Sequence, residues 1–134
     1  MSTACLTLTL PVEIEVIWGY LRELIQSIDG TAINPHIGGV RGWTFEGDEV
    51  ELADWEDATL RKHNIQGLTF WFPDGHDMFV SWGHLQLQRT RLRFNEVRGE
   101  YLLLQKVFGF LLRVVLPGFQ GQLPEEVLLS FSYE

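Results

Sequence analysis

Residues 11–30 have the sequence PVEIEVIWGYLRELIQSIDG and predict the clearest element of the fold, an amphipathic helix over residues 12–29. Apolar side chains recur along it at the three- and four-residue intervals that place them on one face of a helix. Pro11 stands where a helix tolerates a missing N–H, and Gly30 is a common residue after a last helical turn. The predicted apolar face consists of Ile14, Ile17, Trp18, Leu21, Leu24, Ile25 and Ile28.

Alternating apolar and polar residues on both sides of this helix predict strands. Residues 4–10 alternate leucine with threonine, which is typical of a half-buried strand. Residues 67–72 and 76–82 flank Pro73-Asp74-Gly75, and the proline and glycine there suit a tight turn. This segment therefore predicts a β-hairpin.

The remaining segments predict shorter elements. Residues 84–97 change their apolar side near residue 88, which indicates a bulge or a second short strand. Residues 54–63 predict a short helix capped by Asp54. Residues 127–133 alternate again and predict the last strand.

A second long helix is predicted over residues 99–116 and ends before Pro117-Gly118. Its apolar run is shorter than the about 20 residues of a membrane span, and Lys106 and Arg113 interrupt it, so we expect no membrane association. The order of elements predicts one α+β domain over residues 1–134. It has an antiparallel-rich sheet with two helices on one face, a ferredoxin-like variant with an extra hairpin.

The composition restricts the compartment and the partners. The chain has 134 residues and a single cysteine, Cys5, so it forms no internal disulfide, which favours a reducing compartment. The first ten residues lack the positively charged segment of a signal peptide, and we expect a cytoplasmic protein. The net charge of −8 argues against direct binding of nucleic acid.

No catalytic or metal-binding motif is found. The four histidines, His36, His63, His76 and His84, lack the close spacing of metal ligands. The chain contains no GxSxG motif and no phosphate-binding glycine fingerprint. We therefore expect no enzymatic activity, no metal and no cofactor.

The strongest local signal is the acidic segment EGDEVELADWED, residues 46–57, which contains no cation. It is either a solvated acidic surface or a docking surface for a basic protein partner. Trp55 within it has the character of an interface anchor, a large aromatic residue inside a charged rim. The acidic side chains are Glu46, Asp48, Glu49, Glu51, Asp54, Glu56 and Asp57.

Two further groups have open interpretations. Arg89, Arg91 and Arg93 share one face of a predicted strand, where they bind a phosphate or carboxylate, pair with the acidic segment, or protect a sheet edge. In the predicted hairpin, Trp71 and Trp82 are candidates for an exposed aromatic patch that contacts a partner or a second copy of the chain. The alternative is that both faces of the hairpin are buried.

In general character the chain resembles the small immunity proteins of bacterial toxin systems, which are compact, acidic, rich in aromatic residues and without a catalytic signature. The resemblance implies a cytoplasmic bacterial protein that covers the active site of a toxin with an acidic, aromatic surface. Two alternatives are a subunit of a larger assembly and a small-ligand-binding domain. The ligand pocket would be lined by Trp18, Trp43 and Phe108.

Overall fold

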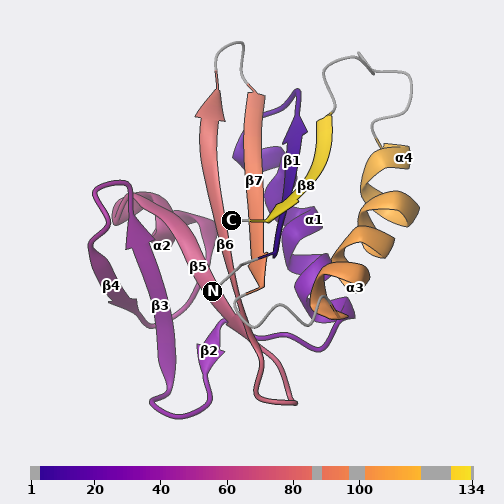
Figure 1. Cartoon of the computed structure of the whole chain (residues 1–134). Helices are drawn as coiled ribbons and strands as arrows, with labels where there is room; N and C mark the ends of the chain where they lie inside the picture. The colour runs from indigo at the N-terminus through magenta and orange to yellow at the C-terminus, as the bar shows by residue number, and fades with distance from the viewer. Residues whose placement is uncertain (1–3, 86–88, 97–101, 119–127, 134) are drawn as a thin grey trace.

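The computed structural model describes residues 4–85, 89–96, 102–118 and 128–133. In these residues eight strands form one open antiparallel sheet, and helices pack against one of its faces (Figure 1). The strands are β1 (Ala4–Leu10), β2 (Ile33–Asn34), β3 (Gly39–Thr44), β4 (Glu49–Leu52), β5 (Ile65–Trp71), β6 (Asp77–Leu85), β7 (Arg89–Glu96) and β8 (Leu128–Tyr133). The helices are α1 (Ile14–Ser27), α2 (Asp57–Lys62) and α3 (Leu102–Phe110), which continues through the π-helical turn η1 (Leu111–Val115) into α4 (Leu116–Gly118).

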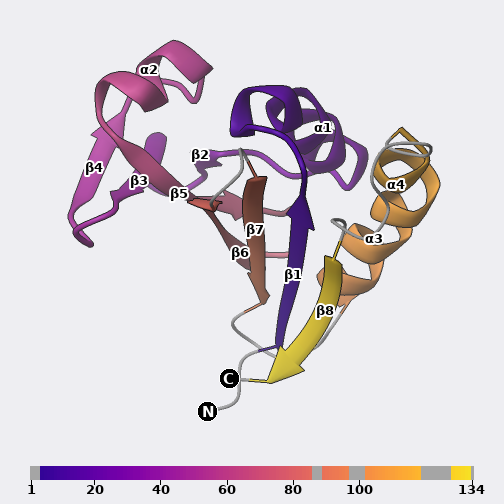
Figure 2. The same cartoon turned by 90° about the horizontal axis from the view of Figure 1, so that it is seen from above.

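The sheet has the strand order β2-β3-β5-β6-β7-β1-β8, and β4 pairs with β3. In Figure 1 α1 lies behind the sheet and α3 stands at its right, beside β8, and the view from above in Figure 2 places them on the same side. The predicted α+β class, with an antiparallel sheet and two helices on one face, is confirmed. The opposite face of the sheet, called the open face below, carries none of the described helices.

The buried face of α1 that the spacing of apolar residues predicts is confirmed, because all seven residues of that face are buried. Its C-terminal cap differs from the prediction: Asp29 takes the left-handed conformation with φ 60°, and Gly30 donates its N–H to the carbonyl of Ile25 at 2.8 Å. Gly30 serves close packing instead, since a Cβ there would lie 2.7 Å from the ring of Phe72.

The predicted hairpin is confirmed as β5 and β6, which pair from Gly67↔Ser81 to Trp71↔Asp77. Gly75 in its turn has φ 87°, a conformation that favours glycine. The predicted change of face near residue 88 is explained by a second strand, because β6 ends at Leu85 and β7 begins at Arg89. Residue 88 itself lies outside the described residues.

Two local predictions are corrected. Strand β1 is buried on both sides rather than half-buried, since Cys5 and Thr9 are also covered at its place between β7 and β8. The short helix begins at Asp57, later than predicted, because the carboxylate of Asp54 accepts the N–H of Glu56 in a turn before it.

The second long helix extends past its predicted end at residue 116. It passes through Pro117 and ends at Gly118, and residues 99–101 of the predicted range lie outside the described residues. Leu102, Phe108 and Leu112 are exposed on its outer side. None of the described helices is both long and apolar enough to span a membrane.

Candidate functional site

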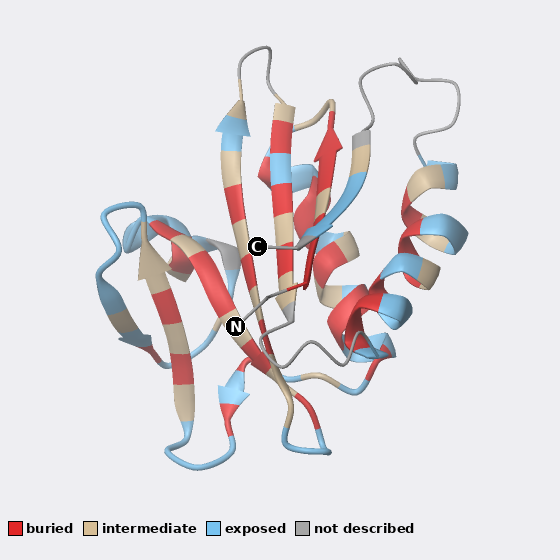
Figure 3. Ribbon diagram, in the orientation of Figure 1, coloured by how far each residue is buried: buried red, intermediate tan, exposed pale blue. Residues whose placement is uncertain are grey.

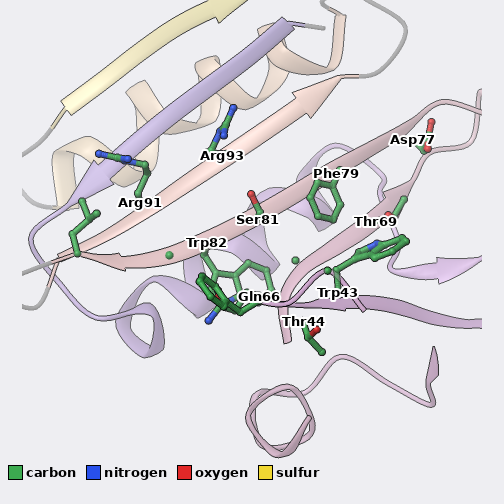
Figure 4. A pocket seen from close by; sticks show the side chains of 15 residues that line it. Trp43, Thr44, Gln66, Thr69, Asp77, Phe79, Ser81, Trp82, Arg91 and Arg93 are labelled. Atoms are coloured by element: carbon green, nitrogen blue, oxygen red, sulfur yellow. The ribbon is translucent and has the colours of Figure 1, made fainter. Parts of the chain in front are cut away.

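The open face is hollowed by a groove of about 760 Å³, shown in Figure 4. The groove follows from one cross-strand row, in which Trp43 pairs with Gly67, Gly67 with Ser81, and Ser81 with Arg93. The two small residues lie in the middle of the row, between two bulky ones. The row therefore makes a trough with an aromatic wall on β3 and a cationic wall on β7, and we call it the open-face groove.

Aromatic rings form the wall on the side of β3. The rings of Trp43 and Phe79 meet edge to face, with centroids 6.5 Å apart. The ring of Phe79 lies over Gly67, where an added Cβ would be 2.5 Å from it. Gly67 thus permits the close approach that fixes the position of this ring.

Arginines of β7 form the opposite wall. Arg91 is exposed and stands across from Gly83, while the half-buried Arg93 stands across from Ser81. Arg93 donates a hydrogen bond from Nη2 to Sγ of Cys5 at 3.6 Å. The interpretation that these residues blunt a sheet edge fails, because β7 lies between β6 and β1 inside the sheet.

The first part of the acidic segment forms the β3–β4 hairpin. We call Glu46, Asp48, Glu49 and Glu51 the acidic hairpin; all four are exposed. Its turn is held by hydrogen bonds between Thr44 and Asp48 and by Gly47 with φ 88°. Arg41 Nε forms an ion pair with Glu49 Oε1 at 2.6 Å.

The strand order separates the acidic hairpin from the arginines of β7. Strand β4 is four strand spacings from β7 along the path β4-β3-β5-β6-β7, which is about 19 Å in a flat sheet. An ion pair needs its atoms within about 4 Å. The cation next to Glu49 and Glu51 is instead Arg41 of β3, which pairs with Glu49 and stands across from Glu51.

The second part of the acidic segment turns away toward the helices. Trp55 is half-buried and its ring meets Phe70 at 5.1 Å and Trp18 at 5.8 Å between centroids. The guanidinium of Arg22 lies 4.7 Å from the centroid of Trp55 and donates a hydrogen bond to its carbonyl oxygen at 2.7 Å. Trp55 thus packs onto the core with part of its ring exposed, and its role as an interface anchor stays a prediction. Asp54 and Glu56 beside it are exposed, and the side chain of Asp57 lies outside the described residues.

Replacing Trp55 by alanine is expected to lower the free energy of unfolding by about 1–3 kcal/mol, less than for a fully buried tryptophan because one side of the ring is exposed. Urea denaturation measures the change. Asp54→Asn is the matched control, since asparagine retains the oxygen that accepts the N–H of Glu56. If Trp55→Ala were as neutral as this control, the ring would not contribute to the core.

The two tryptophans of the β5–β6 hairpin lie on opposite faces. Trp82 is only 7% exposed and its ring meets that of Trp18 at 5.4 Å, so the expectation that it is an exposed contact residue is corrected. Trp71 is half-buried on the open face, across from Asp77. Figure 3 shows the same alternation of buried and partly exposed residues along β6 and β7.

Phe45 is the residue that the sequence analysis missed. It is 78% exposed at the end of β3, next to Glu46, and it also lines the open-face groove. A phenylalanine surrounded by exposed carboxylates has the character of an interface anchor that the sequence analysis assigned to Trp55. The spacing of Trp43 and Phe45 indicated that both lie on one face of a strand. Phe45, however, follows the end of β3 and is exposed to solvent in the turn.

The other candidate chemistry is not assembled in the described part of the chain. Trp18, Trp43 and Phe108 line three separate pockets, so the ligand pocket predicted from them does not form. Within the described ranges, no three His, Cys, Asp or Glu side chains gather as metal ligands. His76 donates its backbone N–H to Asp74 in the turn, which holds the pKa of that carboxyl below its usual value.

Comparisons with protein-family models, with curated proteins and with solved structures found no match to this chain. Its function is therefore inferred from the residues of the open face and the acidic hairpin.

Proposed function

We propose that the chain is a non-enzymatic protein-binding domain that docks a partner with a basic surface on its acidic hairpin. An immunity-type inhibitor, which covers the active site of a bacterial toxin in the cytoplasm, is the form of this function that we favour. The observation that carries the proposal is the exposed ring of Phe45 beside the exposed carboxylates of Glu46 and Asp48 in the β3–β4 turn.

The charge of the acidic hairpin supports a cationic partner. Its carboxylates lie close together on a short hairpin, and Arg41 pairs with Glu49. Like charges held together repel one another and weaken the compact state. A basic partner surface turns this repulsion into attraction and speeds the encounter of the two proteins.

Aromatic side chains next to these charges support a stable complex. Trp43 stands across from Glu49 in the β3–β4 pair, and Phe45 follows in the turn. Interfaces are commonly held by a few desolvated aromatic anchors inside a polar rim, and the rim charges act mainly on the association rate. The acidic hairpin carries both kinds of group.

The experiment uses a triple variant, Glu46→Gln/Asp48→Asn/Glu51→Gln, which spares the ion pair of Glu49. The tagged wild-type chain captures the partner from its native cell, and purified partner is then bound to each variant. We expect the triple variant to fold with a stability within about 0.5 kcal/mol of wild type or above it, and to associate more slowly.

Glu13→Gln/Glu23→Gln/Asp29→Asn removes the same charge from exposed positions near α1 and is the matched control. We expect this control to associate nearly as fast as the wild-type chain. Equal slowing in the two variants would show that only net charge matters. Partner binding that is unchanged in the triple variant would contradict the proposal.

Phe45→Ala tests the anchor separately. We expect a raised dissociation rate of the same complex, by about tenfold or more, with little change in stability because the ring is exposed in the free chain. Surface plasmon resonance measures the rate and thermal denaturation measures the stability. A variant that loses stability and keeps its dissociation rate would assign Phe45 to the fold instead.

For the fold we propose a ferredoxin-like core with an inserted hairpin unit. The order β8-β1-β7-β6 supports it, because a ferredoxin-like sheet has the order of its fourth, first, third and second strands. Helix α1 follows β1 and α3 follows β7, as the helices of that arrangement do. Strands β2 to β5 then extend the sheet beyond β6.

A further inference from the structure

We infer that the open-face groove binds a small planar ring that carries an amino group and a phosphate, as a mononucleotide does. This inference does not rest on the proposed partner docking, although Trp43 and Phe45 belong to both surfaces. It is carried by the shape of the groove, by its aromatic wall and by the arginines of its other wall.

The shape of the groove is that of a ligand site. Its volume of about 760 Å³ lies within the range of small-molecule pockets. The ring of Phe79 covers Gly67, so the open part of the floor is formed by Ser81 and by Gly83, two residues further along β6. A Cβ at Gly83 would meet no atom within 4 Å, so the space above this residue is open.

The aromatic wall offers a surface for a planar ring. Trp43 and Phe79 hold each other in a T-shaped contact, so their positions are set before a ligand enters. Stacking of a nucleobase on an aromatic side chain contributes about 1–3 kcal/mol and does not depend on the identity of the base.

The opposite wall offers a site for the anion. Arg91 and Arg93 are two residues apart on β7, so they share a face with their Cα atoms about 7 Å apart. Arg93 Nη2 already bonds to Sγ of Cys5, so the exposed Arg91 is the group that donates charge-assisted hydrogen bonds to the phosphate. The hydroxyl of Ser81 lies between this wall and the aromatic one (Figure 4).

The charge of the groove orients such a ligand. Asp77 also lines the groove, two residues from Phe79 on the same face of β6. Its carboxylate repels an anion at the aromatic end and accepts hydrogen bonds from an amino group on the ring. The ring is thus directed to Trp43 and the phosphate to Arg91.

The test is a titration of the isotope-labelled chain with adenosine 5′-monophosphate, followed by NMR at the amide signals of Gly67, Ser81 and Gly83. We expect saturable shifts of these signals at millimolar ligand or below. Adenosine and inorganic phosphate, titrated separately, are each expected to bind at least about tenfold more weakly, because each makes half of the contacts.

Two variants locate the site. Arg91→Gln is expected to weaken binding of adenosine 5′-monophosphate at least about tenfold, and Gly83→Val is expected to abolish it by filling the floor while the strand stays folded. Arg113→Gln, an exposed arginine on the helical side, is the control and leaves the affinity unchanged.

The inference is overturned if millimolar adenosine 5′-monophosphate shifts none of the three signals, or if Arg91→Gln binds as the wild-type chain does. Binding of phosphate alone with the same affinity would show that the site recognises only an anion. That result would contradict the proposed binding of a planar ring. The triple variant of the acidic hairpin retains this binding, so a failure here and a failure of partner docking are distinguishable.

Discussion

Replacing Trp82 by alanine is expected to lower the free energy of unfolding by about 3–5 kcal/mol, the usual cost of removing a buried tryptophan. The indole is 7% exposed and packs edge to face against Trp18, so its loss leaves a cavity between β6 and α1. Urea denaturation monitored by circular dichroism measures the change.

Trp71→Ala is the matched control, because this residue belongs to the same hairpin but is half-buried on the open face. We expect it to cost at least about 1 kcal/mol less than Trp82→Ala. If the two costs were equal, or reversed, the assignment of the two faces of the β5–β6 hairpin would be wrong.

Replacing Leu21 by alanine is expected to cost about 2–5 kcal/mol of stability, as truncation of buried leucines does. Leu21 is 2% exposed in the middle of the buried face of α1, and the surrounding core residues cannot fill the space. Val16, on the outer face of the same helix, is 55% exposed.

Val16→Ala is therefore expected to be neutral or slightly stabilising, because alanine has the higher helix propensity. The two variants differ in one respect, the side of α1 on which a side chain is shortened. A loss below about 0.5 kcal/mol for Leu21→Ala would show that the buried face has been misassigned.

Two elements that local sequence determines were predicted correctly. The buried face of α1 follows from the spacing of its apolar residues, and the β5–β6 hairpin follows from Pro73-Asp74-Gly75. The order of strands was not predicted, because β1 pairs with β7 and β8, which lie at the other end of the chain. Such pairing depends on packing between distant segments.

The candidate site was predicted in part. The acidic side chains from Glu46 to Glu51 are exposed as a docking surface requires, but whether they bind a partner stays a prediction. The orientation of the Trp55 side chain toward the core depends on Arg22. This arginine is distant in the sequence and donates a hydrogen bond to the carbonyl oxygen of Trp55. No local pattern contains this contact.

The side of the sheet on which Trp82 lies could have been predicted from the sequence. Met78, Val80 and Trp82 alternate with Asp77, Phe79 and Ser81, and the first set is uniformly apolar, which indicates the core side. The open-face groove could not be predicted from the sequence, because the row from Trp43 to Arg93 requires the pairing of four strands. Gly67 inside a strand was the available signal of a close approach.

The central claim is that the exposed carboxylates of the acidic hairpin attract a basic partner. The most direct test is the association rate constant of the captured partner, measured by stopped flow at increasing salt, for the wild-type chain and for Glu46→Gln/Asp48→Asn/Glu51→Gln. We predict that the wild-type rate is about tenfold higher at low salt, falls steeply as salt screens the charges, and approaches the rate of the variant at high salt. Two parallel salt dependences, with the same rate at low salt, would contradict the claim.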